Sequence, residues 1–96
     1  MYIVVHHHVS DPAKFREIAS AGGALPPGVS LHHSLPTSDG ANVFCLWEAE
    51  SVAAVRDVLE PALGQVSRNE YFEIDPTQPY ASGLPGASAA TAGTAS

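Results

Sequence analysis

The order of six patterned segments restricts the fold more than any other feature of this sequence. Four segments are rich in β-branched and aromatic residues and predict strands, whereas two carry apolar residues at helical spacing. The predicted strands are Tyr2–Val9, Val29–Leu35, Asn42–Ala49 and Arg68–Ile74. The predicted helices follow the capping residues Asp11 and Ser51 and end at Gly22 and Gly64. This order is typical of the α+β class and predicts a ferredoxin-like βαββαβ fold, a four-stranded antiparallel sheet with two helices on one face.

The composition changes after Asp75. Residues 76–96 include three prolines and three glycines and no charged residue, and they offer little apolar surface to bury. We therefore predict a ferredoxin-like domain at residues 1–75 and a disordered Ala/Ser/Gly/Pro tail at residues 76–96. Because about 75 residues form only a small core, we expect the domain to pair with a second copy of itself.

The charge balance excludes several classes of partner. Four Lys/Arg against ten Asp/Glu give a formal net charge of −6, which argues against nucleic acid and anionic membranes. The chain has no apolar run long enough for a transmembrane helix or a signal peptide, so we expect a cytoplasmic protein. A single cysteine excludes an intrachain disulfide and a Cys-x-x-Cys motif.

All five histidines fall in two predicted strands. Strand alternation puts His7 and His33 on the apolar face that the helices cover, together with Cys45. It puts His6, His8, His32 and Glu48 on the opposite face. A hairpin turn near Asp39 places His33 across from Cys45, where Cβ atoms are about 4.5–5.5 Å apart.

Two sets of these side chains suit a metal ion. Imidazole and thiolate are ligands for zinc, nickel and copper, so His7, His33 and Cys45 are the leading candidates, with water or substrate as the fourth ligand. The rival set is His6, His8, His32 and Glu48, three imidazoles and one carboxylate. The structural alternative is that the histidines cover a sheet edge and that Cys45 is a small buried hydrophobe.

Two other functions stay open. A histidine that titrates near neutral pH, with Tyr71 or Glu70 close by, suits a cofactor-free enzyme of the dimeric-barrel type. Such a cyclase, isomerase or monooxygenase uses the histidine as general base on a small aromatic or polyketide-like substrate. A dimeric interaction module whose histidines sense pH is the third hypothesis, and the sequence does not decide whether the chain is an enzyme.

Four motifs together resemble a known family. These are VHH in the first strand, a histidine before the hairpin, VFCLWEA in the third strand and NEYFEI in the last. Over Tyr2–Ile74 they resemble the small actinobacterial nickel-binding proteins of ferredoxin-like fold, which are similar in shape to dimeric α/β-barrel proteins. The resemblance implies a homodimer in which two sheets face each other, with nickel bound at histidine-rich positions. The positions that match the family pattern are His6, His7, His33, Cys45 and Glu48.

The sequence thus predicts a homodimer that binds a divalent transition metal, with nickel expected first and copper or zinc as alternatives. His7, His33 and Cys45 are the expected ligands. His6 and Glu48 are further ligands, or groups that orient a ligand ring.

Overall fold

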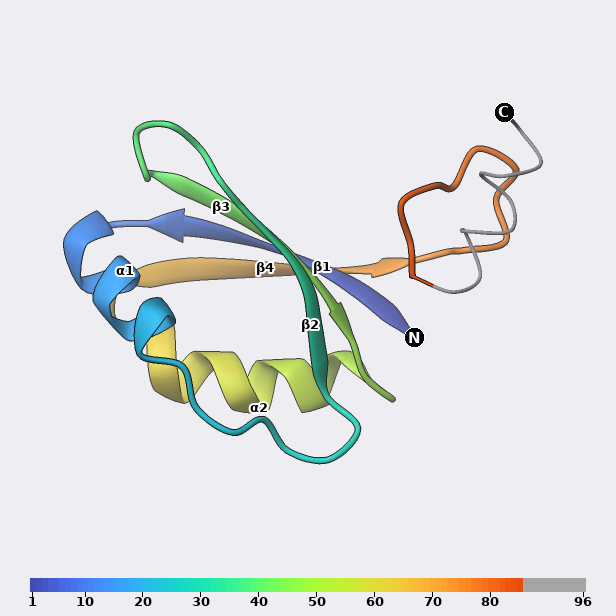
Figure 1. Ribbon diagram of the computed structural model, residues 1–96, viewed down its shortest axis with the longest axis horizontal. Coiled ribbons are helices and arrows are strands. Elements are labelled where there is room, and N and C mark those ends of the chain that lie inside the picture. Colours follow the sequence, from blue (N-terminus) through green and yellow to red (C-terminus); the bar gives the residue numbers. More distant parts are fainter. Residues whose placement is uncertain (86–96) are drawn as a thin grey trace.

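The structure, a computed structural model, describes residues 1–85. It contains six elements in the predicted order (Figure 1). They are β1 (Tyr2–Val9), α1 (Pro12–Ala21), β2 (Ser30–Pro36), β3 (Asn42–Glu48), α2 (Val52–Leu63) and β4 (Ser67–Ile74). The strands form one sheet in the order β2-β3-β1-β4, and every neighbouring pair is antiparallel. Both helices lie on the same side of this sheet, which confirms the ferredoxin-like α+β fold.

Side-chain caps begin both helices where the sequence predicts them. The Asp11 carboxylate accepts a hydrogen bond from the backbone N–H of Lys14 at 3.1 Å, and Pro12 occupies the first turn. The Ser51 hydroxyl accepts from the backbone N–H of Ala54 at 3.1 Å. Neither helix within residues 1–85 is long and apolar enough to cross a membrane.

The core lies between the helices and one face of the sheet. Period-two alternation along β1 and β3 turns the apolar side chains toward the helices, as predicted. The sheet contributes Ile3, Val5, Val43, Cys45 and Trp47, and the helices contribute Phe15, Val55, Leu59 and Leu63. His7 belongs to the same layer, with only 1% of its surface exposed.

A β-bulge in β2 changes which of its side chains face the core. Leu31 lies opposite Trp47, but the next paired residue, His33, lies opposite Leu46, so His32 is the extra residue of the bulge. From this point every side chain of β2 is on the face opposite to the predicted one. The predicted pair of His33 and Cys45 is therefore wrong.

The residue across from Cys45 is Ser34, and His33 lies on the other face of the sheet. Leu35, predicted in the core, is 62% exposed for the same reason. One inserted residue thus separates two of the three leading ligand candidates.

The sheet face that the helices do not cover is called the open face below. It carries Tyr2, Val4, His6 and His8 of β1, with Phe44, Leu46 and Glu48 of β3 beside them. On the other side of β1 it carries Glu70 and Phe72 of β4, and β2 adds His33 and Leu35 at the edge.

The chain turns back after β4 (Figure 1), and residues 81–85 lie against the open face. The Tyr2 hydroxyl donates a hydrogen bond to the carbonyl of Pro85, and Leu84 is only 7% exposed. Leu84 thus supplies apolar surface that the open face buries, whereas the disordered tail from Pro76 stays a prediction. The rest of the predicted tail, residues 86–96, lies outside the described part of the chain.

Candidate metal centre

The histidine triplet of β1 divides between the two faces of the sheet. His7 points into the core, whereas His6 and His8 lie on the open face, with 21% and 31% of their side chains exposed. Because residues two apart on a strand share a face, the two outer rings lie close together, with centroids 3.8 Å apart.

Glu70 completes a group of three with these rings. The register of β1 and β4 puts Glu70 directly opposite His6. The Nδ1 atom of His6 lies 4.0 Å from Oε1 of Glu70, and Nε2 of His8 donates a hydrogen bond to the same oxygen. The three ligand atoms all lie within 4.8 Å of one another, and within residues 1–85 this is the one such group of His, Cys, Asp or Glu. We call His6, His8 and Glu70 the candidate metal centre, or metal centre for short.

Neighbouring side chains fix the orientation of the His6 ring. Its Nε2 atom lies 2.9 Å from Oδ1 of Asn42, an oxygen that only accepts hydrogen bonds. Nε2 therefore carries the ring hydrogen, and the lone pair of the neutral ring lies on Nδ1, the atom that approaches Glu70. The Phe44 ring stacks on His6 with 4.3 Å between centroids and holds its plane. Hydrogen-bonded, packed rings of this kind are how proteins orient metal-binding histidines.

The electrostatics of the centre favour an ionised carboxylate. The hydrogen bond from His8 is the largest effect that lowers the pKa of Glu70, and Arg68 and His6 act in the same direction. The Arg68 guanidinium lies 3.6 Å from Oε1 of Glu70. This cation stabilises the carboxylate, but it also opposes the entry of a positive ion.

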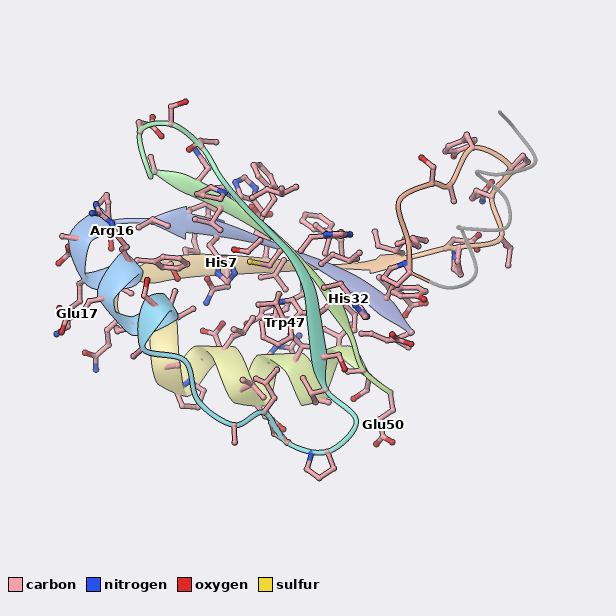
Figure 2. All side chains as sticks on the ribbon, viewed as in Figure 1. His7, Arg16, Glu17, His32, Trp47 and Glu50 are labelled. Carbon is pink, nitrogen blue, oxygen red and sulfur yellow. The ribbon has the colours of Figure 1, made fainter. Side chains whose placement is uncertain are left out.

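His7, the first of the predicted ligands, is a core residue. Its Nδ1–H donates to Oδ1 of Asn69 at 2.6 Å, and its ring meets Phe15 edge-on at 5.2 Å. Burial is the main effect on its pKa, which is lowered, so the ring is neutral at pH 7. Figure 2 shows His7 between the sheet and the helices.

Cys45 is buried in the same layer, where its thiol lies 3.6 Å from the hydroxyl of Ser34. Burial raises the pKa of this thiol, which disfavours the thiolate that binds metals. Since His33 lies on the open face, the structure does not bring His7, His33 and Cys45 together. Their joint role as ligands stays a prediction.

The rival set of His6, His8, His32 and Glu48 separates into two groups. His32 pairs with Glu48 at 2.8 Å, next to Tyr2, while His6 and His8 gather around Glu70. Glu48 therefore has one imidazole partner rather than three, and its role as a ligand also stays a prediction.

The sequence pattern predicts Glu70 only as an acid–base group near a histidine and not as a metal ligand. The signal that identifies it is the pairing of β1 with β4, which sets His6 against Glu70. Tyr71, the other acid–base candidate, points to the opposite face and donates a hydrogen bond to Glu60. Burial and Glu60 raise the pKa of Tyr71, so its hydroxyl stays protonated at neutral pH.

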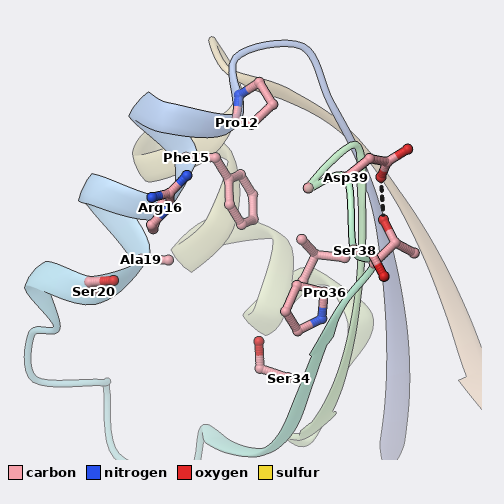
Figure 3. Close-up of a pocket in the computed structure, with 12 residues that line it drawn as sticks. Pro12, Phe15, Arg16, Ala19, Ser20, Ser34, Pro36, Ser38 and Asp39 are labelled. Atoms are coloured by element: carbon pink, nitrogen blue, oxygen red, sulfur yellow. Dashed lines mark hydrogen bonds between the residues drawn. The ribbon is translucent and has the colours of Figure 1, made fainter.

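A hollow of about 330 Å³ lies between α1 and the β2–β3 hairpin (Figure 3). Phe15 and Val43 form its apolar wall, and Arg16 and Asp39 lie at its edge. The Asp39 carboxylate accepts from the backbone N–H of Ala41 at 2.9 Å and from the Thr37 hydroxyl at 2.7 Å, which lowers its pKa. These bonds hold the hairpin turn, so the carboxylate serves the fold rather than a site.

Comparison with known proteins finds no protein-family model that matches this chain and no significant match among curated proteins.

Proposed function

We propose that this protein binds a divalent transition metal ion at His6, His8 and Glu70. The observation that supports the proposal is the approach of two imidazole nitrogens and one carboxylate oxygen to within 4.8 Å of one another. Three protein ligands with an open fourth position are the usual composition of catalytic rather than structural zinc sites.

Only small movements convert this arrangement into a coordination sphere. Metal–ligand bonds of about 2.0–2.2 Å put tetrahedral ligand atoms roughly 3.3 Å from one another. His6 Nδ1, now 4.0 Å from Glu70 Oε1, must approach by less than the length of a bond. In His8 the Nε2 atom now carries the hydrogen that it donates to Glu70. When this hydrogen moves to Nδ1 in the neutral ring, the lone pair of Nε2 becomes available to a metal ion.

The donor set restricts the identity of the ion. Two imidazoles and one carboxylate suit zinc, copper and nickel, and the same set in facial arrangement holds non-haem iron(II). Among these we propose nickel, which the resemblance of β1, β3 and β4 to the nickel-binding family implies. Calcium and magnesium prefer oxygen-only sites and are not expected to bind here.

We also propose that the protein is a homodimer in which two open faces meet. Three open-face side chains support this arrangement, because Leu35, Phe44 and Phe72 are 62%, 38% and 48% exposed. Apolar side chains that share one face of a small domain mark an interaction surface. Sedimentation velocity tests the dimer. Wild type is expected to sediment as a dimer and the Phe72→Lys variant as a monomer. A wild-type monomer at 100 μM, roughly the highest dissociation constant of a weak dimer, contradicts the proposal.

Metal binding is tested with the full chain, without an affinity tag, after removal of metal with EDTA. Ni²⁺, Zn²⁺, Cu²⁺ or Mg²⁺ is added, and the thermal midpoint and calorimetric stoichiometry are measured. At a hundredfold excess over Kd, a specific ion stabilises the folded state by about 2.7 kcal/mol. His8→Ala and Glu70→Gln are each expected to remove this gain.

The chain offers a matched control for the metal centre. His32 and Glu48 are also a paired imidazole and carboxylate on the open face, but no third ligand joins them among residues 1–85. His32→Ala and Glu48→Gln are expected to keep the metal-dependent gain. If His33→Ala and Cys45→Ser remove the metal-dependent stabilisation while His8→Ala keeps it, the ion is bound by His33 and Cys45. The proposed centre is then wrong.

A further inference from the structure

The open face contains a second feature, a hollow of about 550 Å³ between the sheet and residues 81–84. Apolar side chains make up most of its lining, namely Val4, Leu35, Phe44, Leu46, Ile74 and Leu84. Its volume falls within the range of about 300–1,000 Å³ that small-molecule sites occupy. We call it the open-face pocket.

Residues 81–85 close one side of this pocket. The segment is fixed at Pro85, whose carbonyl accepts from the Tyr2 hydroxyl, and at Gly83, whose carbonyl lies 3.3 Å from Nε2 of His33. Leu46 is 8% exposed although it lies on the face without helices. By contrast, Leu35 and Phe44 at the mouth remain 62% and 38% exposed. In the single chain the pocket therefore has a covered floor and an entrance, and in the proposed homodimer this entrance faces the partner subunit.

His33 and Ser82 are the polar residues that line this pocket, and the metal centre uses neither of them. A backbone carbonyl only accepts hydrogen bonds, so the Nε2 atom that approaches Gly83 carries the ring hydrogen. In the neutral ring the lone pair is then on Nδ1, which accepts a hydrogen bond from a hydroxyl group. No Lys, Arg, Asp or Glu is among the described residues that line the pocket, so nothing there compensates a charged ligand.

From this combination we infer that the open-face pocket binds a small uncharged aromatic alcohol of the phenol class. The aromatic body lies among Val4, Leu46 and Phe44, and its hydroxyl donates to Nδ1 of His33. The inference is independent of the proposed metal function, because none of the three metal-centre residues lines the pocket. It supplies the substrate-binding element that a cofactor-free enzyme requires, without assigning a reaction.

The test measures the binding of 2-naphthol to the full chain by calorimetry in EDTA, beside 2-methoxynaphthalene, which lacks the hydroxyl hydrogen. A single neutral hydrogen bond makes the naphthol bind roughly fivefold more tightly than the ether. His33→Phe is expected to abolish this preference while both compounds still bind. Ala81→Trp is expected to fill the pocket and to weaken both compounds at least tenfold.

Leu25→Ser is the control, because Leu25 is an exposed apolar residue outside the open face and does not line the pocket. It is expected to leave the affinity for both compounds within twofold. Equal affinity of wild type for naphthol and ether overturns the role of His33. Full binding by Ala81→Trp, or loss of binding by Leu25→Ser, overturns the site itself. Circular dichroism of each variant verifies the fold, and the His8→Ala variant, defective only in the metal centre, is expected to bind naphthol normally.

Discussion

His6 donates its Nε2–H to Oδ1 of Asn42 across 2.9 Å, and this bond leaves the lone pair of the ring on the Nδ1 atom that approaches Glu70. Asn42 thus selects the tautomer that a metal ion requires, although it offers no ligand itself.

Replacement of Asn42 by alanine removes this selection. We expect Asn42→Ala to weaken metal binding about tenfold, because the loss of a partner that orients a ligand ring typically costs 10–100-fold. Asn42→Asp, which keeps an acceptor at the same place, is expected to bind at least as tightly as wild type. Calorimetric titration with Zn²⁺ and Ni²⁺ measures both, with Ser30→Ala as a control elsewhere on the sheet. Unchanged affinity in Asn42→Ala contradicts the assignment of Nδ1 as the ligand atom.

Arg68 is expected to restrain metal affinity, because its guanidinium lies 3.6 Å from the Glu70 carboxylate. Arg68→Gln removes a positive charge beside the ion, and we expect an affinity three- to tenfold higher (roughly 1 kcal/mol) at low salt. At about 0.15 M salt the gain should shrink, because the Debye length falls to about 8 Å. Lys14→Gln, a change of the same charge on α1, is the control. A gain that is the same at both salt concentrations, or no gain, is incompatible with this electrostatic role.

Protonation of Glu60 is expected to lower the stability of the folded protein at acid pH. Hydrogen bonds from Tyr71 and then Asn69 lower the pKa of its carboxyl below the ordinary value of 4.5. In the unfolded chain the carboxyl takes up a proton at higher pH than in the folded chain. The stabilisation is therefore present above pH 4.5 and is lost as the pH falls through the folded pKa.

Urea unfolding between pH 7 and pH 3 (roughly spanning the carboxyl titration range) measures this loss. Glu60→Gln is expected to lose less stability over this range than wild type does. Glu73→Gln, at an exposed position of β4, should follow the wild-type curve. Identical pH profiles for wild type and Glu60→Gln show that the hydrogen bonds to Glu60 do not contribute.

Cys45 is expected to react slowly with thiol reagents. The thiol is buried, and burial raises its pKa above the ordinary value of 9.0, so little thiolate forms in the folded state at pH 8. Burial of the protonated Cys45 thiol contributes fully to stability below pH 9.0. This contribution is lost as the pH rises through the pKa of the folded state. Ellman's reagent should modify the native protein at least 100-fold more slowly than the urea-unfolded chain, on the order expected for a site that must open first. Rapid native modification is inconsistent with this burial.

The sequence was sufficient for the element order because each element carries local signals. Asp11 and Ser51 cap the helices, and alternation places His6 and His8 on one face and His7 on the other. These preferences depend on neighbours in the chain, so they can be recognised without tertiary structure.

The partners of these residues were not predictable in the same way. Glu70 meets His6 only through the register of β1 with β4, which long-range pairing determines. His33 lies on the open face because His32 forms a β-bulge in β2. The local sequence pattern of β2 does not indicate this bulge. Leu84 is one apolar residue in a polar segment, and its burial depends on a surface that only the folded sheet provides.

The most direct test of the metal centre is the position of a bound ion. Crystals grown with Ni²⁺, measured at the nickel absorption edge, give an anomalous difference peak at each ordered nickel. We expect a peak about 2.0–2.2 Å from Nδ1 of His6, from Nε2 of His8 and from a Glu70 carboxylate oxygen. A peak beside Cys45 or His33, or between His32 and Glu48, with none at His6 and His8, contradicts the proposed centre.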